Sequence, residues 1–172
     1  MPNKWAFSAT ASDDLDDDDW ILDTGASCQM VCDVSMLFKA DHCASSEVFR
    51  QPDGTPLQVT KRGKVCLHTS IDGLNTEIEL SSAYFSPKLT RNLVSYGRLA
   101  DHGCLLGQFQ GRHAVLKNGK VVFYVAIKNY VMVIDRAVIQ KDNRAIGEIV
   151  MSAVATVGSG SAVQVGTLMN FH

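Results

Sequence analysis

The chain has 172 residues, of which 46% are hydrophobic and 20% are charged, so it can bury one sizeable core but is short for two full domains. No run of about 18 apolar residues could span a bilayer, and the N-terminus lacks the basic and apolar regions of a signal peptide. The formal net charge is −2 and no Lys/Arg-rich block is present, so we expect neither a membrane partner nor direct nucleic-acid binding. Five cysteines at irregular spacings suit free thiols in a reducing compartment better than a disulfide framework.

Residues 1–19 are small and polar at first and then strongly acidic. The stretch from Asp13 to Asp19 holds six of the 18 acidic residues of the chain. Neighbouring carboxylates repel one another and cannot contribute to a hydrophobic core. We therefore predict a disordered acidic leader over residues 1–19.

From residue 20 onward, short apolar runs alternate with turn residues, mostly with the period of two that is typical of strands. Asn118-Gly119 lies between two such runs and predicts a hairpin, and Asp72-Gly73 and Pro52-Asp53-Gly54 predict further turns. One short helix is predicted around Val94 to Asp101. The pattern as a whole predicts an all-β domain. The predicted strands include residues 20–22, 47–50, 57–59, 65–67, 78–80, 84–85, 113–117 and 120–124.

The composition changes after Asp135. Residues 153–166 are rich in Gly, Ser, Ala and Val without a sustained period. We therefore predict that residues 20–135 form the domain and that residues 136–167 form a linker.

The segment Trp20 to Ser27 carries the residues with the clearest chemistry. An apolar strand leads into Asp23, and two carboxylates held at about 3 Å share one proton because they cannot both ionise. One carboxylate can then take a proton from water while the other polarises a peptide carbonyl. Gly25 lets backbone approach a substrate closely, and Thr24 can hold the loop by hydrogen bonds to backbone.

The sequence contains a single Asp-Thr-Gly. A second catalytic aspartate must therefore come from another copy of the chain, and the predicted active unit is a homodimer. Taken alone, Asp-Thr-Gly is more often an ordinary turn than a catalytic loop. The apolar strand before it and the small residues after it favour the catalytic interpretation.

This segment resembles the start of the protease region of Ty1/copia Pol polyproteins, and the resemblance extends over residues 20–135. Val48 to Val59 looks like the flap hairpin of that family, and Gly63 matches a glycine that enters its next strand. Ser86 to Ser95 looks like the second retropepsin motif, which precedes a short helix. The resemblance implies a small closed retropepsin-like β-barrel with a flap hairpin and one short helix.

The resemblance also implies an activity, the cleavage of Gag-Pol peptide bonds by a homodimeric aspartic endopeptidase in the cytoplasm or inside virus-like particles. We expect neither a metal nor another cofactor. The implied site residues are the catalytic Asp23, the active-site loop Thr24, Gly25, Ala26 and Ser27, the flap residues Pro52, Asp53, Gly54 and Thr55, and the second-motif residues Arg91, Asn92 and Leu93.

Some residues depart from the retropepsin pattern. Many retropepsins have an acidic residue at the position of Ser27, where it pairs with an arginine of the second motif, so Arg91 is expected to lack that partner. Thr90 replaces a glycine that is usual in retroviral members, whereas Ser27 is common in the copia branch. Residues 168–172 are similar to the start of the pre-integrase segment that follows the protease in such polyproteins.

Competing interpretations remain open at this stage. Ser27 would be the nucleophile of a serine hydrolase, but Gln29 stands where that motif needs glycine. A zinc site at Cys28, Cys32, His42 and Cys43 is disfavoured because adjacent residues converge poorly on one ion.

Three further histidines, His68, His102 and His113, are isolated in the sequence, which favours surface or core roles over metal binding.

A second interpretation of the whole chain is also open. The alternative function is a catalytically silent β-barrel from a truncated retroelement that serves as a structural or assembly module, with Asp23 merely capping a turn.

Overall fold

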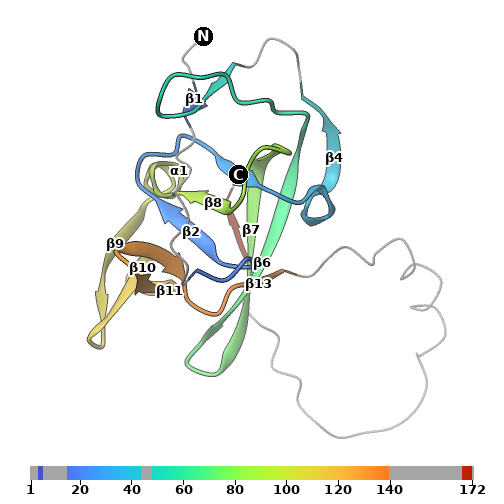
Figure 1. Ribbon diagram of the computed structural model, residues 1–172. Coiled ribbons are helices and arrows are strands. Elements are labelled where there is room, and N and C mark those ends of the chain that lie inside the picture. The colour runs from blue at the N-terminus through green and yellow to red at the C-terminus, as the bar shows by residue number, and fades with distance from the viewer. Residues whose placement is uncertain (1–3, 6–14, 44–47, 140–167, 172) are drawn as a thin grey trace, which may run out of the picture.

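The computed structural model describes residues 4–5, 15–43, 48–139 and 168–171 (Figure 1). The prediction of an all-β domain with one short helix is confirmed. The helices are the 3-10 helix η1 (Val34–Met36) and α1 (Tyr96–Asp101). The strands are β1 (Lys4–Trp5), β2 (Trp20–Asp23), β3 (Gln29–Val31), β4 (Phe38–His42), β5 (Phe49–Arg50), β6 (Lys61–Ile71), β7 (Leu74–Phe85), β8 (Asn92–Ser95), β9 (Cys104–Phe109), β10 (Arg112–Lys117), β11 (Lys120–Lys128), β12 (Val131–Ile134), β13 (Val138–Ile139) and β14 (Leu168–Phe171).

Most strands belong to one sheet with the order β13-β6-β7-β3-β8-β2-β12-β11-β10-β9, to which β4 adds at β6 and β14 adds at β7. β1 and β5 form a separate parallel pair. The sheet curls around its core, because β11 contacts β6 although the two strands are far apart in this order. Tyr124 donates a hydrogen bond to Asp72 Oδ1 at 3.0 Å, and Thr69 Oγ1 donates one to the Asp135 carbonyl at 3.1 Å. These bonds connect the long β6–β7 hairpin to β11 and to the end of β12.

The hairpin turns follow local sequence chemistry. Asp72-Gly73 joins β6 to β7 with φ values of 51° and 85°, and Asn118-Gly119 joins β10 to β11 with 51° and 75°. Positive φ at both central residues is the requirement of a type I′ turn, so the predicted Asn118-Gly119 hairpin and the predicted turn at Asp72-Gly73 are confirmed. Gln110-Gly111 makes an equivalent turn between β9 and β10, with φ values of 48° and 76°, which the sequence pattern did not predict. No strand forms at residues 57–59, where one was predicted.

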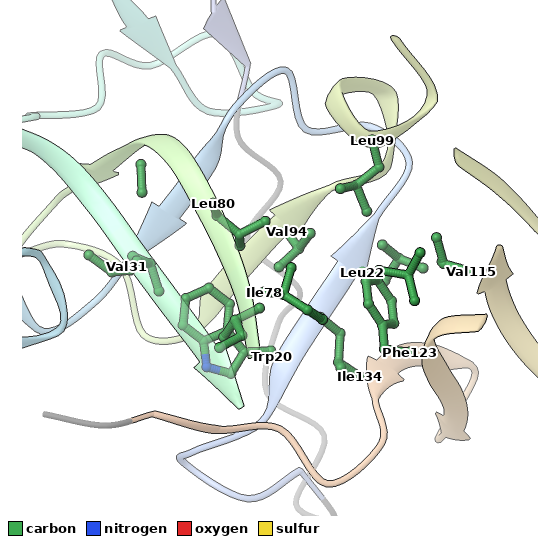
Figure 2. Packing of buried hydrophobic residues seen from close by; sticks show 14 of the residues in the cluster. Trp20, Leu22, Val31, Ile78, Leu80, Val94, Leu99, Val115, Phe123 and Ile134 are labelled. Atoms are coloured by element: carbon green, nitrogen blue, oxygen red, sulfur yellow. The ribbon is translucent and has the colours of Figure 1, made fainter. Parts of the chain in front are cut away.

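β2 and β8 are buried on both faces. Trp20, Leu22 and Val94 belong to the larger core cluster, while Ile21 and Leu93 belong to a second cluster. Figure 2 shows Leu22 and Val94 among core side chains of other strands, including those of the β10–β11 hairpin. Burying one such leucine contributes about 1.5–3 kcal/mol, so the two cores fix β2 from both sides.

Parts of the predicted terminal segments are described. Leu15 of the predicted leader is buried in the second cluster, while residues 1–3 and 6–14 lie outside the described residues. Of the predicted linker, β13 pairs with β6, and residues 140–167 lie outside the described residues. β14, which covers most of the predicted pre-integrase start, pairs in parallel with β7. No helix of the described chain is long and apolar enough to cross a membrane.

Candidate active site

The two sequence motifs lie side by side in the sheet. β2 runs parallel to β8, with Trp20 opposite Asn92 and Asp23 opposite Ser95. Asp23 is the last residue of β2, and α1 follows directly after β8. The sheet therefore brings the Asp23 loop, the second motif and the start of the helix to the same end of two neighbouring strands.

The loop after β2 is held by its own aspartate. The Gly25 N–H donates a hydrogen bond of 2.7 Å to Asp23 Oδ1. Asp23 is half-buried, Thr24 and Gly25 are exposed, and Ala26 is buried. The carboxylate is thus fixed at the end of a buried strand, with exposed backbone beside it. Thr24 is exposed in this chain, and its predicted role in bracing the loop stays a prediction.

Ser95 connects this loop to the second motif. Its Oγ donates a hydrogen bond to the Ala26 carbonyl at 2.6 Å and accepts one from the Arg98 N–H at 3.2 Å, which caps α1. Its backbone N–H donates to Gln29 Oε1 at 2.8 Å. Ser95 and Gln29 are both buried. Neither was among the predicted site residues, although a serine directly before a short helix is a recognisable N-cap signal.

Asn92 and Leu93 of the second motif are both buried. Asn92 Oδ1 accepts hydrogen bonds from the Cys32 N–H at 3.0 Å and from its Sγ at 3.3 Å. Burial raises the pKa of the Cys32 thiol above its ordinary value. Asn92 Nδ2 and Trp20 Nε1, which lie on paired residues, are buried with no hydrogen-bond partner among the described residues. Leu93 packs in the second core cluster.

Arg91 has acidic partners that the sequence analysis did not predict. Its Nη1 donates a hydrogen bond to the Asp16 carbonyl and lies 3.4 Å from Asp17 Oδ1. The position that is acidic in many retropepsins holds Ser27, but Arg91 pairs with a carboxylate elsewhere in the chain. The partner comes from the acidic segment before the domain instead of from the position of Ser27. Lys128 anchors the same segment through contacts with Asp16 and Asp19 at 3.0 and 2.9 Å.

The predicted flap residues form a tight turn. Asp53 Oδ1 accepts hydrogen bonds from Thr55 Oγ1 at 2.7 Å and from the Thr55 N–H at 2.9 Å. These bonds hold the pKa of Asp53 below its ordinary value. Gly54 has a φ of 84°, and its carbonyl accepts a hydrogen bond from Arg50 Nη1 at 2.9 Å. Pro52, which precedes them, is exposed.

The base of this turn packs into the second core cluster. Phe49 and Leu57 share that cluster with Cys28 and Met30, which follow the Asp23 loop in the chain. The Phe49 and Tyr84 rings pack with centroids 4.8 Å apart. Figure 1 shows the turn near β1, at the top of the view. The flap and the Asp23 loop therefore share one apolar support.

Comparison with known families adds one finding. Residues 20–104 match the family model described as Pol polyprotein, beta-barrel domain. The match supports a retroelement Pol polyprotein segment. It spans β2 to the first residue of β9 and so includes the Asp23 loop, the flap and the second motif. A search of curated proteins and a search of solved structures found no match.

The cysteines and histidines of the chain are arranged differently from any group that the sequence suggested. Among the described residues, the ligand atoms that come within 4.8 Å of one another belong to Cys66, His68 and Glu77. Cys28, Cys32, His42 and Cys43 form no such group there. His68 has close potential co-ligands, because strand pairing brings together residues that look isolated in the sequence.

Proposed function

We propose that this Pol β-barrel segment is an aspartic endopeptidase of a Ty1/copia-like retroelement that cleaves as a homodimer. The observation that carries the proposal is the position of Asp23. Asp23 ends the buried strand β2 and pairs in the sheet with Ser95 of the second motif, and its carboxylate accepts the Gly25 N–H at 2.7 Å. A carboxylate with this support is oriented by buried structure while the adjoining backbone stays exposed.

The chemistry needs two such carboxylates. One chain supplies one Asp-Thr-Gly, so two copies would place their Asp23 side chains against each other. The pair would share one proton. One Asp23 would then act as general base on a water molecule, while the protonated Asp23 donates a hydrogen bond to the scissile carbonyl.

The remaining site residues would bind and enclose the peptide. Gly25 and Ala26 would offer backbone groups to the substrate, and Thr24 would brace the loop. Serine, as at Ser27, is common at this position in the copia branch. Pro52, Asp53, Gly54 and Thr55 would close over the bound peptide and exclude water. The hydrogen bonds within the turn hold its tip rigid. The tip would therefore move as one unit during this closure.

The substrates and location follow from the resemblance. The resemblance implies Gag-Pol junctions as substrates, and their processing would take place in the cytoplasm or inside virus-like particles. Neither a nucleic acid nor a membrane takes part in this reaction, and the peptide hydrolysis itself uses only the aspartates and water.

The test compares peptide cleavage by the parent chain and by Asp23→Asn at high protein concentration with a peptide library. Asp41→Asn is a matched control, because Asp41 is an exposed carboxylate of β4. Turnover by the parent and Asp41→Asn, with a loss of about 10³-fold or more in Asp23→Asn, supports the proposal. Equal turnover in all three variants contradicts the aspartate mechanism. A folded parent chain without turnover favours the silent structural barrel.

A further inference from the structure

The outward face of the β6–β7 hairpin carries a group of polar side chains that the proposed protease reaction does not use. Val65 and Leu67 of β6 and Ile78 and Leu80 of β7 point into the larger core cluster. Because side chains alternate along a strand, their neighbours lie on the opposite face. These neighbours are Lys64, Cys66 and His68 on β6 and Glu77 and Glu79 on β7.

Strand register brings three of these side chains together. His68 lies directly opposite Glu77 in the antiparallel ladder, and Cys66 lies two residues before His68 on the same face. Cys66 Sγ is 2.8 Å from Glu77 Oε1 and 3.7 Å from His68 Nε2. The ligand atoms of all three residues lie within 4.8 Å of one another.

The separations suit a tetrahedral metal ion. Zinc bonds of about 2.3 Å to sulfur and about 2.0–2.2 Å to nitrogen or oxygen put neighbouring ligand atoms about 3.5 Å apart. The Cys66–His68 distance of 3.7 Å already fits this value. The Cys66–Glu77 distance is shorter because the thiol donates its proton to the carboxylate. A metal ion would replace that proton.

The types of ligand select the metal. Thiolate and imidazole favour Zn²⁺ over Mg²⁺ or Ca²⁺, which prefer oxygen ligands. Cys66 is buried, whereas His68 and Glu77 are half-buried, so water can reach a fourth coordination position. We propose that Cys66, His68 and Glu77 bind one Zn²⁺ ion, with water as the fourth ligand.

The adjacent ion pair keeps the site to three protein ligands. Glu79 lies opposite Cys66 in the ladder, but its Oε1 is 2.6 Å from Lys64 Nζ. A carboxylate held by an ammonium group is less available to a metal, and the lysine charge disfavours a cation beside it. Glu77 is therefore the carboxylate ligand.

The site is separate from the proposed active site. Its residues lie on one hairpin, and none of them belongs to the Asp23 loop, the flap or the second motif. Zn²⁺ would cross-link β6 to β7 and so stabilise the folded chain. Binding also requires loss of the thiol proton, so the affinity increases with pH while Cys66 remains protonated.

The test titrates the reduced full chain with ZnCl₂ in competition with a chromogenic chelator and follows Co²⁺ absorption as a probe of thiolate coordination. We expect one equivalent of bound metal, a thiolate-to-Co²⁺ band and an increase in the melting temperature. We expect at least about tenfold weaker binding in each of the variants Cys66→Ser, His68→Gln and Glu77→Gln. Changes to residues that only hydrogen-bond to metal ligands commonly weaken binding by that much, and these variants remove the ligands themselves. Cys43→Ser and His113→Gln, which change residues outside this group, should bind within about twofold of the parent.

Two results would overturn this assignment. One is the absence of stoichiometric Zn²⁺ binding by the folded parent chain, with folding checked by circular dichroism. The other is unchanged binding by the Cys66→Ser and His68→Gln variants. Because the readouts are metal affinity and melting temperature, they are independent of whether the chain cleaves peptides.

Discussion

The side-chain hydroxyl of Ser95 donates a hydrogen bond to the carbonyl oxygen of Ala26, with 2.6 Å between the two oxygens. The two residues are 69 positions apart in the sequence. One contact thereby joins the Asp23 loop to the strand and helix of the second motif. Because Ser95 is fully buried, nothing from solvent can replace it.

Ser95→Ala should destabilise the fold by about 2–3 kcal/mol, because it leaves the buried Ala26 carbonyl without this donor and removes the cap of α1. Urea unfolding measures the loss. Ser86→Ala is the matched control, since Ser86 is equally buried but its hydroxyl accepts only a longer 3.3 Å bond from the Lys88 N–H. Equal losses in the two variants would contradict the special role of Ser95.

Gly63→Ala should lower the free energy of unfolding by about 1–3 kcal/mol. An added Cβ would lie 3.0 Å from the Phe38 carbonyl oxygen and 3.2 Å from the Ala40 Cα, and neither backbone atom can move without shifting β4. Gly107→Ala is the control, because its Cβ would meet only the flexible Leu116 side chain at 3.7 Å. Urea unfolding of both variants tests the difference. A Gly63→Ala chain as stable as the parent would contradict this prediction, because β4 would then shift to accommodate the methyl group at little cost in free energy.

The flap turn should persist at moderately acidic pH. The pKa of Asp53 is lowered from 3.8 by hydrogen bonds from the Thr55 side chain and backbone. A lowered folded-state pKa means that the stabilising contribution is present above the unfolded-state value and is lost as the pH falls through the folded-state value. The turn should therefore hold at pH 4 and above and loosen only at lower pH.

The Thr55 amide resonance reports this transition by NMR. Its titration midpoint should lie below 3.8, the ordinary value for the carboxyl group. Asp53→Asn keeps a neutral acceptor, so this variant should show no such step. A midpoint at or above that ordinary value would contradict the hydrogen bonds at the flap tip.

Lys128→Met should weaken attachment of the acidic segment and lower the free energy of unfolding by up to about 1 kcal/mol at low salt, with a smaller effect at high salt. Hydrogen bonds to Asp19 and Asp16 raise the pKa of Lys128 above 10.5. A raised folded-state pKa gives a contribution that is complete below the unfolded-state value and is lost as the pH rises through the folded-state value.

The effect of Lys128→Met should therefore be the same at pH 7 and pH 9. Lys120→Met, at the exposed opposite end of β11, should change stability by less. Urea unfolding at both pH values and two salt concentrations gives the comparison. An effect that is independent of salt would argue against an electrostatic attachment.

Local chemistry made several features predictable. Asp72-Gly73 and Asn118-Gly119 adopt the φ values that a two-residue hairpin requires, and aspartate, asparagine and glycine adopt them at low cost. The order of apolar runs gave the all-β class and the position of α1. The continuous apolar run Trp20 to Leu22 differs from period-two alternation because β2 is buried on both faces.

Long-range contacts could not be predicted in the same way. The partner of Arg91 lies in the acidic segment, because the chain before β2 packs back onto the domain. The grouping of Cys66, His68 and Glu77 depends on the exact register of β6 and β7, and a shift of one residue would separate them. Gln29 carries no local signal for its bond to the Ser95 N–H.

The central claim is that two Asp23 residues from two chains form one active site. The most direct test adds increasing amounts of Asp23→Asn chain to a fixed amount of parent chain and measures cleavage of a peptide substrate. Mixed dimers would hold one carboxylate, so we predict that the activity decreases progressively toward zero as Asp23→Asn is added in excess. Activity that stays constant throughout this titration would contradict a shared active site.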